Sequence, residues 1–167
     1  MAVREIVTLP DPVLRRKAHK VKEYNKELRD LLEDMVETMR QAPGVGLAAP
    51  QIGISQRIIV VEYGEEDQEE APKKLYKLIN PEIIQKSEEK VKGVEGCLSV
   101  VNLVGEVERH QAVVVKAFNP FGKPVKIKAE GWLARIFQHE IDHLDGVLFP
   151  DIAERVWVPS AEEEIPA

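Results

Sequence analysis

The sequence predicts an α+β fold in a single domain spanning residues 1–167. At 167 residues, the chain is long enough to form one hydrophobic core. Only two long segments have the apolar spacing of an α-helix, whereas several shorter ones have the composition of β-strands. Hydrophobic residues (44%) and charged residues (31%) occur at the levels of an ordinary globular domain, and no repeat or linker divides the chain. A few helices among many strands favour the α+β class.

The first part of the chain contains one strong helix between shorter elements. Residues 11–18 predict a short helical turn, since a proline is tolerated at a helix start. Residues 25–42 predict the clearest helix, because Leu and Met recur at helical spacing, Asn25 can cap the start, and a Pro-Gly pair follows. Residues 56–63 predict a buried strand.

The middle of the chain predicts mostly strands. The charged stretch 64–74 predicts an exposed loop. Residues 75–90 predict a strand, a break and a second strand, because Pro81 interrupts the pattern. Residues 104–130 predict two or three strands with a turn at "NPFG" (119–122).

The C-terminal part predicts one helix and a loose end. Residues 131–146 have helical spacing and finish at a glycine, a common helix stop. Residues 159–167, "PSAEEEIPA", predict a flexible acidic tail.

Composition and charge exclude several classes of protein. The formal charge is 23 − 29 = −6, which argues against a nucleic-acid binder. No apolar run fits a membrane span, and the N-terminal residues lack the apolar core of a signal peptide. The lone cysteine, Cys97, cannot form an intramolecular disulfide, which fits a reducing compartment. We therefore expect a cytoplasmic protein without membrane or nucleic-acid partners.

The segment "QHEIDHLDG" (138–146) points to a metal. His139 and His143 lie one helical turn apart, so both imidazoles share a helix face. Glu140 points about 100° around the helix, where it can act beside a metal without binding it. The same face extends upstream into a stripe that we expect to line a substrate pocket: Trp132, Arg135 and Ile136.

A catalytic site needs a third ligand. The histidine that some metalloproteases carry six residues after the second one is absent here, because Phe149 occupies that position. A glutamate downstream of His143 is a poor candidate for the third ligand, since the glutamates that follow lie mostly in the tail. Upstream, Cys97 offers a thiolate, and one Cys with two His leaves a fourth tetrahedral position open. Taken alone, Cys97 is also compatible with a buried apolar role.

Three separated motifs resemble those of the peptide deformylase family. They are, in order, "GVGLAAPQ" (44–51), "EGCLS" (95–99) and "QHEIDH" (138–143), and the resemblance runs over most of the chain. The resemblance implies an enzyme that removes the formyl group from the N-terminal methionine of new polypeptides. It also implies antiparallel sheets around a central metal-binding helix. The implied metal is one divalent ion, most often Fe2+, with Zn2+, Ni2+ or Co2+ as alternatives.

The resemblance also implies roles for individual residues. Cys97, His139 and His143 would be the metal ligands and Glu140 the acid/base. Gln51 and the backbone N–H of Leu98 would bind the formyl oxygen. Small residues would let a peptide backbone lie close, and Val45 would contribute to the methionine pocket, which gives the substrate-binding candidates Gly44, Val45, Gly46 and Gly96 beside the helix stripe. The implied partners are formylmethionyl nascent peptides and, transiently, the ribosome, although the acidic tail argues against docking through the C-terminus.

Other interpretations remain open at this level. Val101 stands where the family has a proline, and the arginine expected shortly afterwards is absent, so a different substrate, such as an unformylated peptide, is an alternative. A structural metal site would need four protein ligands, and the chain offers three good ones. A dinucleotide loop at 44–49 is disfavoured, because Ala49 replaces the last glycine and no strand precedes it. Arg109 has a structural or surface role in our interpretation, with substrate anchoring as the alternative.

Overall fold

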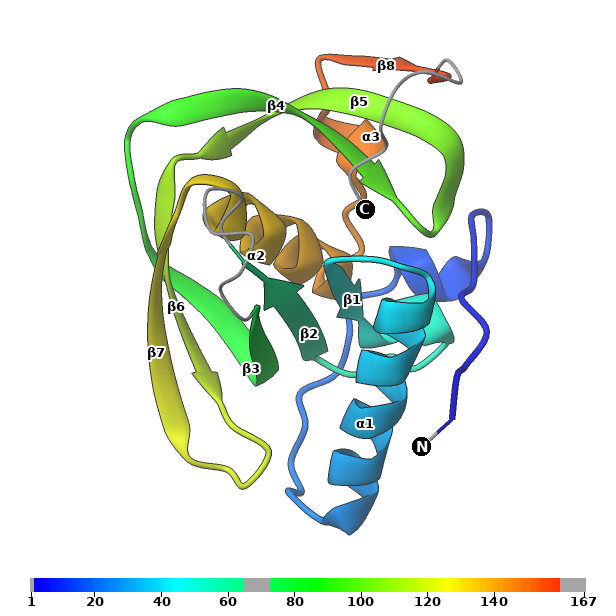
Figure 1. The fold of residues 1–167 in the computed structure, drawn as a ribbon, viewed down its shortest axis with the longest axis vertical. Coiled ribbons are helices and arrows are strands. Elements are labelled where there is room, and N and C mark those ends of the chain that lie inside the picture. The colour runs from blue at the N-terminus through cyan, green and yellow to red at the C-terminus, as the bar shows by residue number, and fades with distance from the viewer. Residues whose placement is uncertain (1, 65–72, 160–167) are drawn as a thin grey trace.

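Two antiparallel β-sheets surround a central helix in the computed structural model of the chain, which describes residues 2–64 and 73–159 (Figure 1). The helices are η1 (Pro12–Arg15), α1 (Lys26–Gln41), η2 (Ala49–Ile52), α2 (Gly131–Leu144) and α3 (Phe149–Ile152). The strands are β1 (Gly46–Ala48), β2 (Ile58–Tyr63), β3 (Lys74–Lys86), β4 (Lys90–Cys97), β5 (Val100–His110), β6 (Ala112–Phe118), β7 (Pro124–Glu130) and β8 (Arg155–Trp157). The predicted α+β fold is confirmed.

The two sheets approach α2 from different sides. One has five strands in the order β1-β2-β3-β6-β7, and the other has three in the order β4-β5-β8. Figure 1 shows β4 and β5 arching over α2, with β1, β2 and β6 on its other sides. The chain passes from the small sheet to the large one at Gln111, the single residue between β5 and β6. Helix α2 is therefore held between two sheets.

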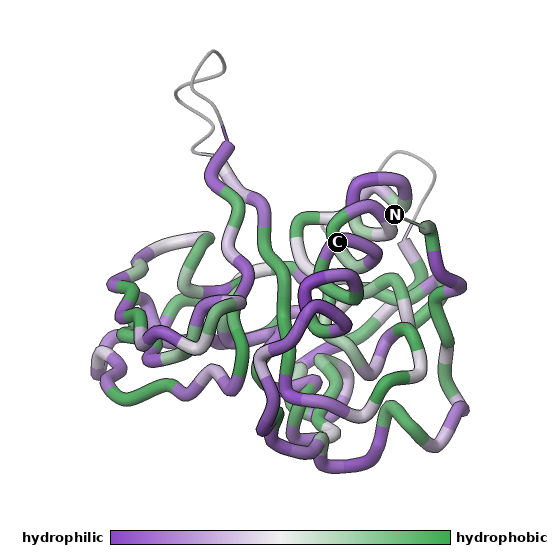
Figure 2. The backbone as a smooth tube through the Cα atoms, turned by 90° about the horizontal axis from the view of Figure 1, so that it is seen from below, coloured by the Kyte–Doolittle hydropathy of each residue, from purple (hydrophilic) through white to green (hydrophobic). Residues whose placement is uncertain are grey.

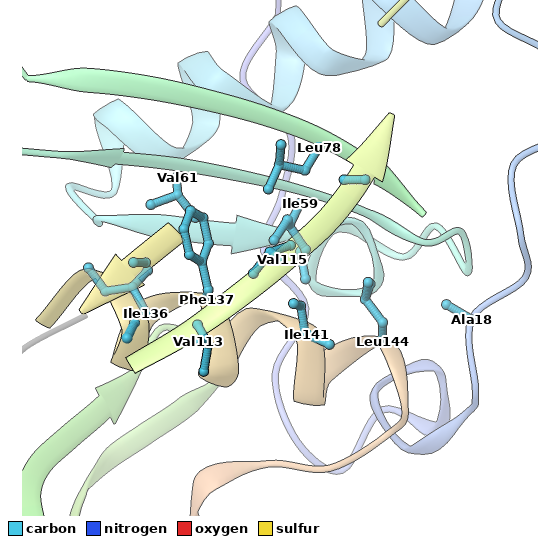
Figure 3. Close-up of a cluster of buried hydrophobic side chains, with 14 residues drawn as sticks. Ala18, Ile59, Val61, Leu78, Val113, Val115, Ile136, Phe137, Ile141 and Leu144 are labelled. Carbon is cyan, nitrogen blue, oxygen red and sulfur yellow. The ribbon is translucent and has the colours of Figure 1, made fainter. Parts of the chain in front are cut away.

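Helix α2 buries an apolar face against the five-stranded sheet. Figure 3 shows Phe137 and Ile141 of the helix directed toward Ile59 and Val115 of the sheet. Phe137 is fully buried, and its ring meets that of Tyr76 edge-on at a centroid distance of 5.2 Å. Because this face of α2 is occupied by the large sheet, the packing determines which other residues of the helix can face the small sheet.

Strand β2 is buried on both of its faces. Ile59 and Val61 pack with α2, while Ile58 and Val60 pack with α1. Elsewhere along the chain, hydrophilic and hydrophobic residues alternate over short stretches (Figure 2). A strand covered on both sides reads instead as a continuous apolar run, which explains the sequence "IIVV" at 58–61.

Both long predicted helices are present. Helix α1 begins after Asn25, whose side-chain oxygen accepts a hydrogen bond of 3.0 Å from the backbone N–H of Leu28. The predicted turn at 11–18 is shorter than expected, because only η1 is helical there. Helix α2 ends two residues before Gly146, which has a positive φ of 77°.

The predicted break at Pro81 is wrong. Strand β3 runs through it as one strand, with a shift of register against β6 between Ile79 and Glu82. Asn80 has a φ of 53°, so the irregular residue precedes the proline. A proline removes one N–H from the ladder, and a bulge absorbs that loss without ending the strand.

The region 104–130 forms three strands, with their partners divided between the sheets. Strand β6 pairs with β7 across the predicted turn, whereas β5 pairs with β4 and β8. The short elements β1, η2, α3 and β8 were not predicted. Most of the predicted loop 64–74 and of the tail 159–167 lies outside the described residues. No helix in the described part is long and apolar enough to cross a membrane.

Candidate metal centre

Three potential metal ligands converge between the small sheet and α2. Cys97 is the last residue of β4, and His139 and His143 are one turn apart on α2. One ligand atom from each residue lies within 4.8 Å of the other two. The Sγ atom of Cys97 is 3.3 Å from Nε2 of His143. The structure thus brings together the three residues that the sequence assigned to the metal.

The chemistry of these donors fits a divalent metal ion. A thiolate with two imidazoles suits Zn2+, Fe2+, Co2+ and Ni2+, and three protein ligands leave a coordination position for water or substrate. Burial lowers the pKa of His143 well below its ordinary value, so its ring stays neutral and keeps a lone pair. Burial also disfavours protonation of His139, but hydrogen bonds to Cys97 and Glu95 outweigh it and raise this pKa, so a metal would have to displace a proton there.

A buried carboxylate orients one of the imidazoles. Oε1 of Glu95 lies 2.8 Å from Nδ1 of His139. Arg109 donates two hydrogen bonds to Glu95, of 2.9 and 2.8 Å, and one to Asp142. Burial alone would raise the pKa of Glu95, but the bonds from Arg109 and His139 lower it below its ordinary value, so the carboxylate stays charged. With Nδ1 committed to Glu95, Nε2 of His139 is the nitrogen left for a metal.

Glu95 is a site residue that sequence reasoning missed. Its only local signal is its place two residues before Cys97 in "EGCLS". The structural role considered for Arg109 fits its position, since this residue is 5% exposed and pairs with Glu95 and Asp142.

Glu140 is buried beside the ligands. The residue is 3% exposed, and burial raises the pKa of its carboxyl group to about 7. Among the described residues, its Oε1 atom has no hydrogen-bond partner. Its other oxygen lies against Gly46, where a Cβ atom would come within 2.5 Å of Oε2. A carboxylate that is buried and incompletely hydrogen-bonded has spare capacity to accept a proton or a hydrogen bond from a ligand.

Gln51 and Leu98 lie at the other side of Cys97. The side-chain oxygen of Gln51 accepts a 3.0 Å hydrogen bond from the N–H of Ala48, which identifies Nε2 as the donor. Nε2 faces Sγ of Cys97 at 3.6 Å and Oγ of Ser99 at 3.2 Å. Leu98 lies in the two-residue turn between β4 and β5. The predicted oxyanion donors are thus next to a candidate ligand.

A small pocket, of about 30 Å³, opens beside the ligands. Most of the predicted substrate-binding residues line it, namely Val45, Gly96, Trp132, Arg135 and Ile136. Glu95, His139 and Glu140 complete the lining. Gly44 instead packs against the side chain of Leu98. A Cβ atom added at Gly44 would lie 3.2 Å from Cδ1 of Leu98. Gly46 supports Glu140 rather than the pocket wall.

Comparison with known proteins agrees with this arrangement. Residues 3–156 match the family model described as polypeptide deformylase. The chain belongs to the peptide deformylase family. The peptide deformylase of Symbiobacterium thermophilum is 57% identical over 151 residues, which cover 90% of this chain and 67% of that protein. That of Natranaerobius thermophilus is 53% identical over 157 residues, with coverages of 94% and 96%.

Solved peptide deformylases share the fold. The crystal structure from Thermotoga maritima matches with a TM-score of 0.86 and 41% identity, covering 93% of this chain and 100% of that one. A structure from Ehrlichia chaffeensis in complex with actinonin matches with a TM-score of 0.87 and 42% identity, covering 93% and 91%. These matches span both sheets and α2.

Membership of the family establishes the reaction. Peptide deformylases remove the N-formyl group from nascent polypeptides, so the chain is a hydrolase that acts on a formamide. The metal dependence of the family agrees with the Cys97, His139 and His143 group. The peptidase and structural-metal interpretations are therefore set aside.

Proposed function

We propose that Glu140 is the general base and acid of the deformylation reaction. The observation that carries this proposal is its buried carboxylate beside His139, whose pKa is raised and whose Oε1 atom has no hydrogen-bond partner in the described part of the chain. Such a group takes a proton from the attacking water and returns it to the amine nitrogen of the leaving methionine. A pKa near neutrality suits both transfers. Gly46 supports this role because the absence of a Cβ atom there lets the Glu140 side chain approach β1 closely.

We also propose that Gln51 and Leu98 stabilise the oxygen of the formyl group. As the carbonyl becomes tetrahedral, its oxygen gains negative charge, and a neutral N–H donor held in place stabilises it. One such donor contributes about 2.7–4 kcal/mol in other hydrolases. The amide of Gln51 is held by Ala48 in the orientation that presents Nε2. The backbone N–H of Leu98, in a tight turn, is the second donor of this proposal.

In this proposal, Cys97, His139 and His143 hold one divalent ion, with Fe2+ as the native metal and Zn2+, Ni2+ or Co2+ as substitutes. When bound, such an ion would lower the pKa of water far below its ordinary value, to about 7 in favourable sites, and would polarise a carbonyl. The protein's part is to keep the imidazole of His139 oriented through Glu95 and to keep His143 neutral.

The methionine side chain of the substrate would enter the pocket beside α2. Val45, Ile136 and the ring of Trp132 supply its apolar wall. The glycines at 44 and 96 leave room for the peptide backbone, with Gly44 next to Leu98 and Gly96 lining the pocket. A thioether is long, flexible and weakly polar, so it fits such a wall.

We place the enzyme in the cytoplasm as a single catalytic domain over residues 1–167, acting on formylmethionyl nascent peptides. Transient association with the ribosome is part of this proposal, because the substrate exists there. The acidic composition of "AEEEIPA" (161–167) disfavours contact of the C-terminal end with RNA.

Glu140→Gln tests the proposed mechanism. We expect the release of formate from formyl-Met-Ala to fall by at least a hundredfold, while metal content stays near that of the wild type, because Glu140 is not a ligand. The assay uses anaerobically purified protein, with metal determined by elemental analysis on the same sample. Arg16→Gln, at an exposed position outside the site, is the control. Normal turnover by Glu140→Gln would remove this residue from the mechanism.

A further inference from the structure

Arg135 lines the substrate pocket, where its guanidinium lies 5.4 Å from the ring centre of Trp132, but its hydrogen bonds go to the β4–β5 hairpin. Its guanidinium is buried, and its side chain is 6% exposed. Nη1 donates to Oε2 of Glu95 at 2.6 Å and to the backbone oxygen of Val107 at 2.9 Å. Nη2 donates to the backbone oxygen of Val91 at 2.6 Å. One side chain of α2 thus holds β4 at two points and β5 at a third.

The guanidinium of Arg135 packs against the backbone of Gly93. A Cβ atom at that position would lie 2.8 Å from Cζ of Arg135 and 3.0 Å from Nε and Nη2. Gly93 pairs directly with Val107 across the sheet, and it stands between Val91 and Glu95 on β4. The three residues that Arg135 binds therefore surround the one residue that makes room for it. An arginine end group is normally flexible, but three hydrogen bonds prevent this one from moving aside at low cost.

The two parts joined by Arg135 carry different ligands of the proposed metal site. The β4–β5 hairpin carries Cys97 and Leu98, while α2 carries His139 and His143. Cys97 and His139 are 42 positions apart in the chain, so their spacing depends on how the hairpin is fixed to the helix. Arg135 stands one turn before His139, on the same helix.

We propose that Arg135, seated on Gly93, is a positioning residue that fixes the hairpin against α2 and thereby sets the spacing of Cys97 and the two histidines before a metal binds. This inference rests on the proposed metal site and adds a cause for its preorganisation. Arg109 supports Glu95 independently, so Glu95 keeps a cationic partner when Arg135 is replaced. Loss of Arg135 should therefore loosen the hairpin without leaving an unpaired buried carboxylate.

The direct test is the zinc affinity of the metal-free protein, measured by competition with a chromophoric chelator. In Arg135→Met we expect zinc affinity to fall roughly tenfold to a hundredfold, the range found when groups that orient metal ligands are removed. Arg135→Lys keeps the charge, but an ammonium group cannot reach all three acceptors of the guanidinium. The zinc affinity of this variant should therefore lie between those of the wild type and Arg135→Met. Val36→Ala, in the separate core against α1, is the matched control, since it lowers stability without touching the hairpin.

A second test uses the contact with Gly93. Gly93→Ala should weaken zinc binding in the wild-type background, because the new methyl group displaces the guanidinium. In the Arg135→Met background the same change should have little further effect, because the group it displaces is gone. The absorption spectrum of bound Co2+ gives a second readout, since weakened thiolate binding by Cys97 lowers the charge-transfer band.

The outcomes separate the inference from the proposed function. Failure of the wild-type protein to bind zinc would overturn the metal site itself. Wild-type affinity in Arg135→Met or Gly93→Ala would overturn the role of Arg135 and leave the metal site intact. Additive losses in the double variant, or an equal loss in Val36→Ala, would also overturn it. If Arg135→Met does not fold, Arg135→Lys and Gly93→Ala decide the question.

Discussion

Glu140 and Gly46 act as a matched pair, although they lie on different elements. The carboxylate of Glu140 packs onto the backbone of β1 at the one residue without a side chain. The sequence suggested that glycines at 44–46 make room for a peptide. At Gly46 the structure gives a different reason: the space is taken by the side chain of Glu140.

Gly46→Ala should therefore impair catalysis without emptying the metal site. The new Cβ would stand 2.5 Å from Oε2 of Glu140, so the carboxylate must move. We expect kcat to fall at least tenfold, while zinc affinity changes less than twofold, because the three ligands are not displaced. Steady-state kinetics with formyl-Met-Ala and chelator competition measure the two quantities.

The control for that variant is Gly64→Ala, where the new methyl group meets the flexible Lys73 side chain at 3.2 Å. It should retain wild-type kcat. An unchanged kcat in Gly46→Ala would show that Glu140 does not need its observed position.

Glu95 shows what single residues do not reveal in the sequence. Its partners are Arg109 on β5 and Arg135 and His139 on α2, all distant in the chain. A glutamate in a strand is ordinarily exposed, and nothing in the local pattern predicts that Glu95 is buried with three charged or polar partners. Arg135 was expected in the pocket wall for its helical spacing, and it does line the pocket, but its charged end serves the β4–β5 hairpin.

Among the elements, helices were predicted more accurately than strands. The bounds of α1 follow from its cap at Asn25 and from helical spacing, which are local signals. The path of β3 through Pro81 depends on β6, which tolerates a shift of register there. The partners of β5 could not be assigned locally, because β4 and β6 flank it equally in sequence.

The contact between α1 and β2 gives a pH-dependent contribution to stability. Arg40, at the end of α1, donates two hydrogen bonds to Glu62 on β2, of 3.0 and 2.7 Å. The hydrogen bond from Arg40 lowers the pKa of Glu62 below the ordinary 4.5. A lowered folded-state pKa stabilises the fold above the ordinary pKa, and this contribution is lost as the pH falls through the folded value.

Glu62→Gln should consequently cost about 0.5 kcal/mol of unfolding free energy at pH 7, the scale of a partly exposed ion pair. The cost should shrink toward zero when the pH is taken below the folded-state pKa. Urea denaturation of both proteins between pH 7 and pH 3 measures the difference. Glu33→Gln, at an exposed position on α1, provides the comparison. A cost that is constant over this range would contradict the assigned pKa shift.

At the scale of the whole molecule, the metal centre lies where the two sheets meet. The small sheet supplies Cys97, and α2, packed on the large sheet, supplies the two histidines. A metal bound there would add a direct link between the β4–β5 hairpin and α2 to the side-chain contacts and chain connections that already join the two sheets. Metal binding and the stability of this junction should therefore be linked.

Removing the metal should lower the thermal stability. An ion present at a hundred times its dissociation constant stabilises the folded state by about 2.7 kcal/mol. For a chain of this size, that corresponds to a shift in Tm of roughly 5–10 °C. Scanning calorimetry with and without a chelator measures it. Cys97→Ala should have a Tm that the chelator does not change, and an equal shift in that variant would place the metal elsewhere.

The sequence by itself determined the α+β class, the two long helices and the three candidate ligands. These features depend on spacing along one element, such as His139 and His143 one turn apart, or on a motif such as "EGCLS". Only the tertiary structure decided that Gly46 supports Glu140, that Glu95 orients His139, and that Arg135 binds the β4–β5 hairpin from the pocket wall. The physical reason is that burial and ion pairing depend on contacts between segments far apart in the chain, and their pairing is fixed when the two sheets close around α2.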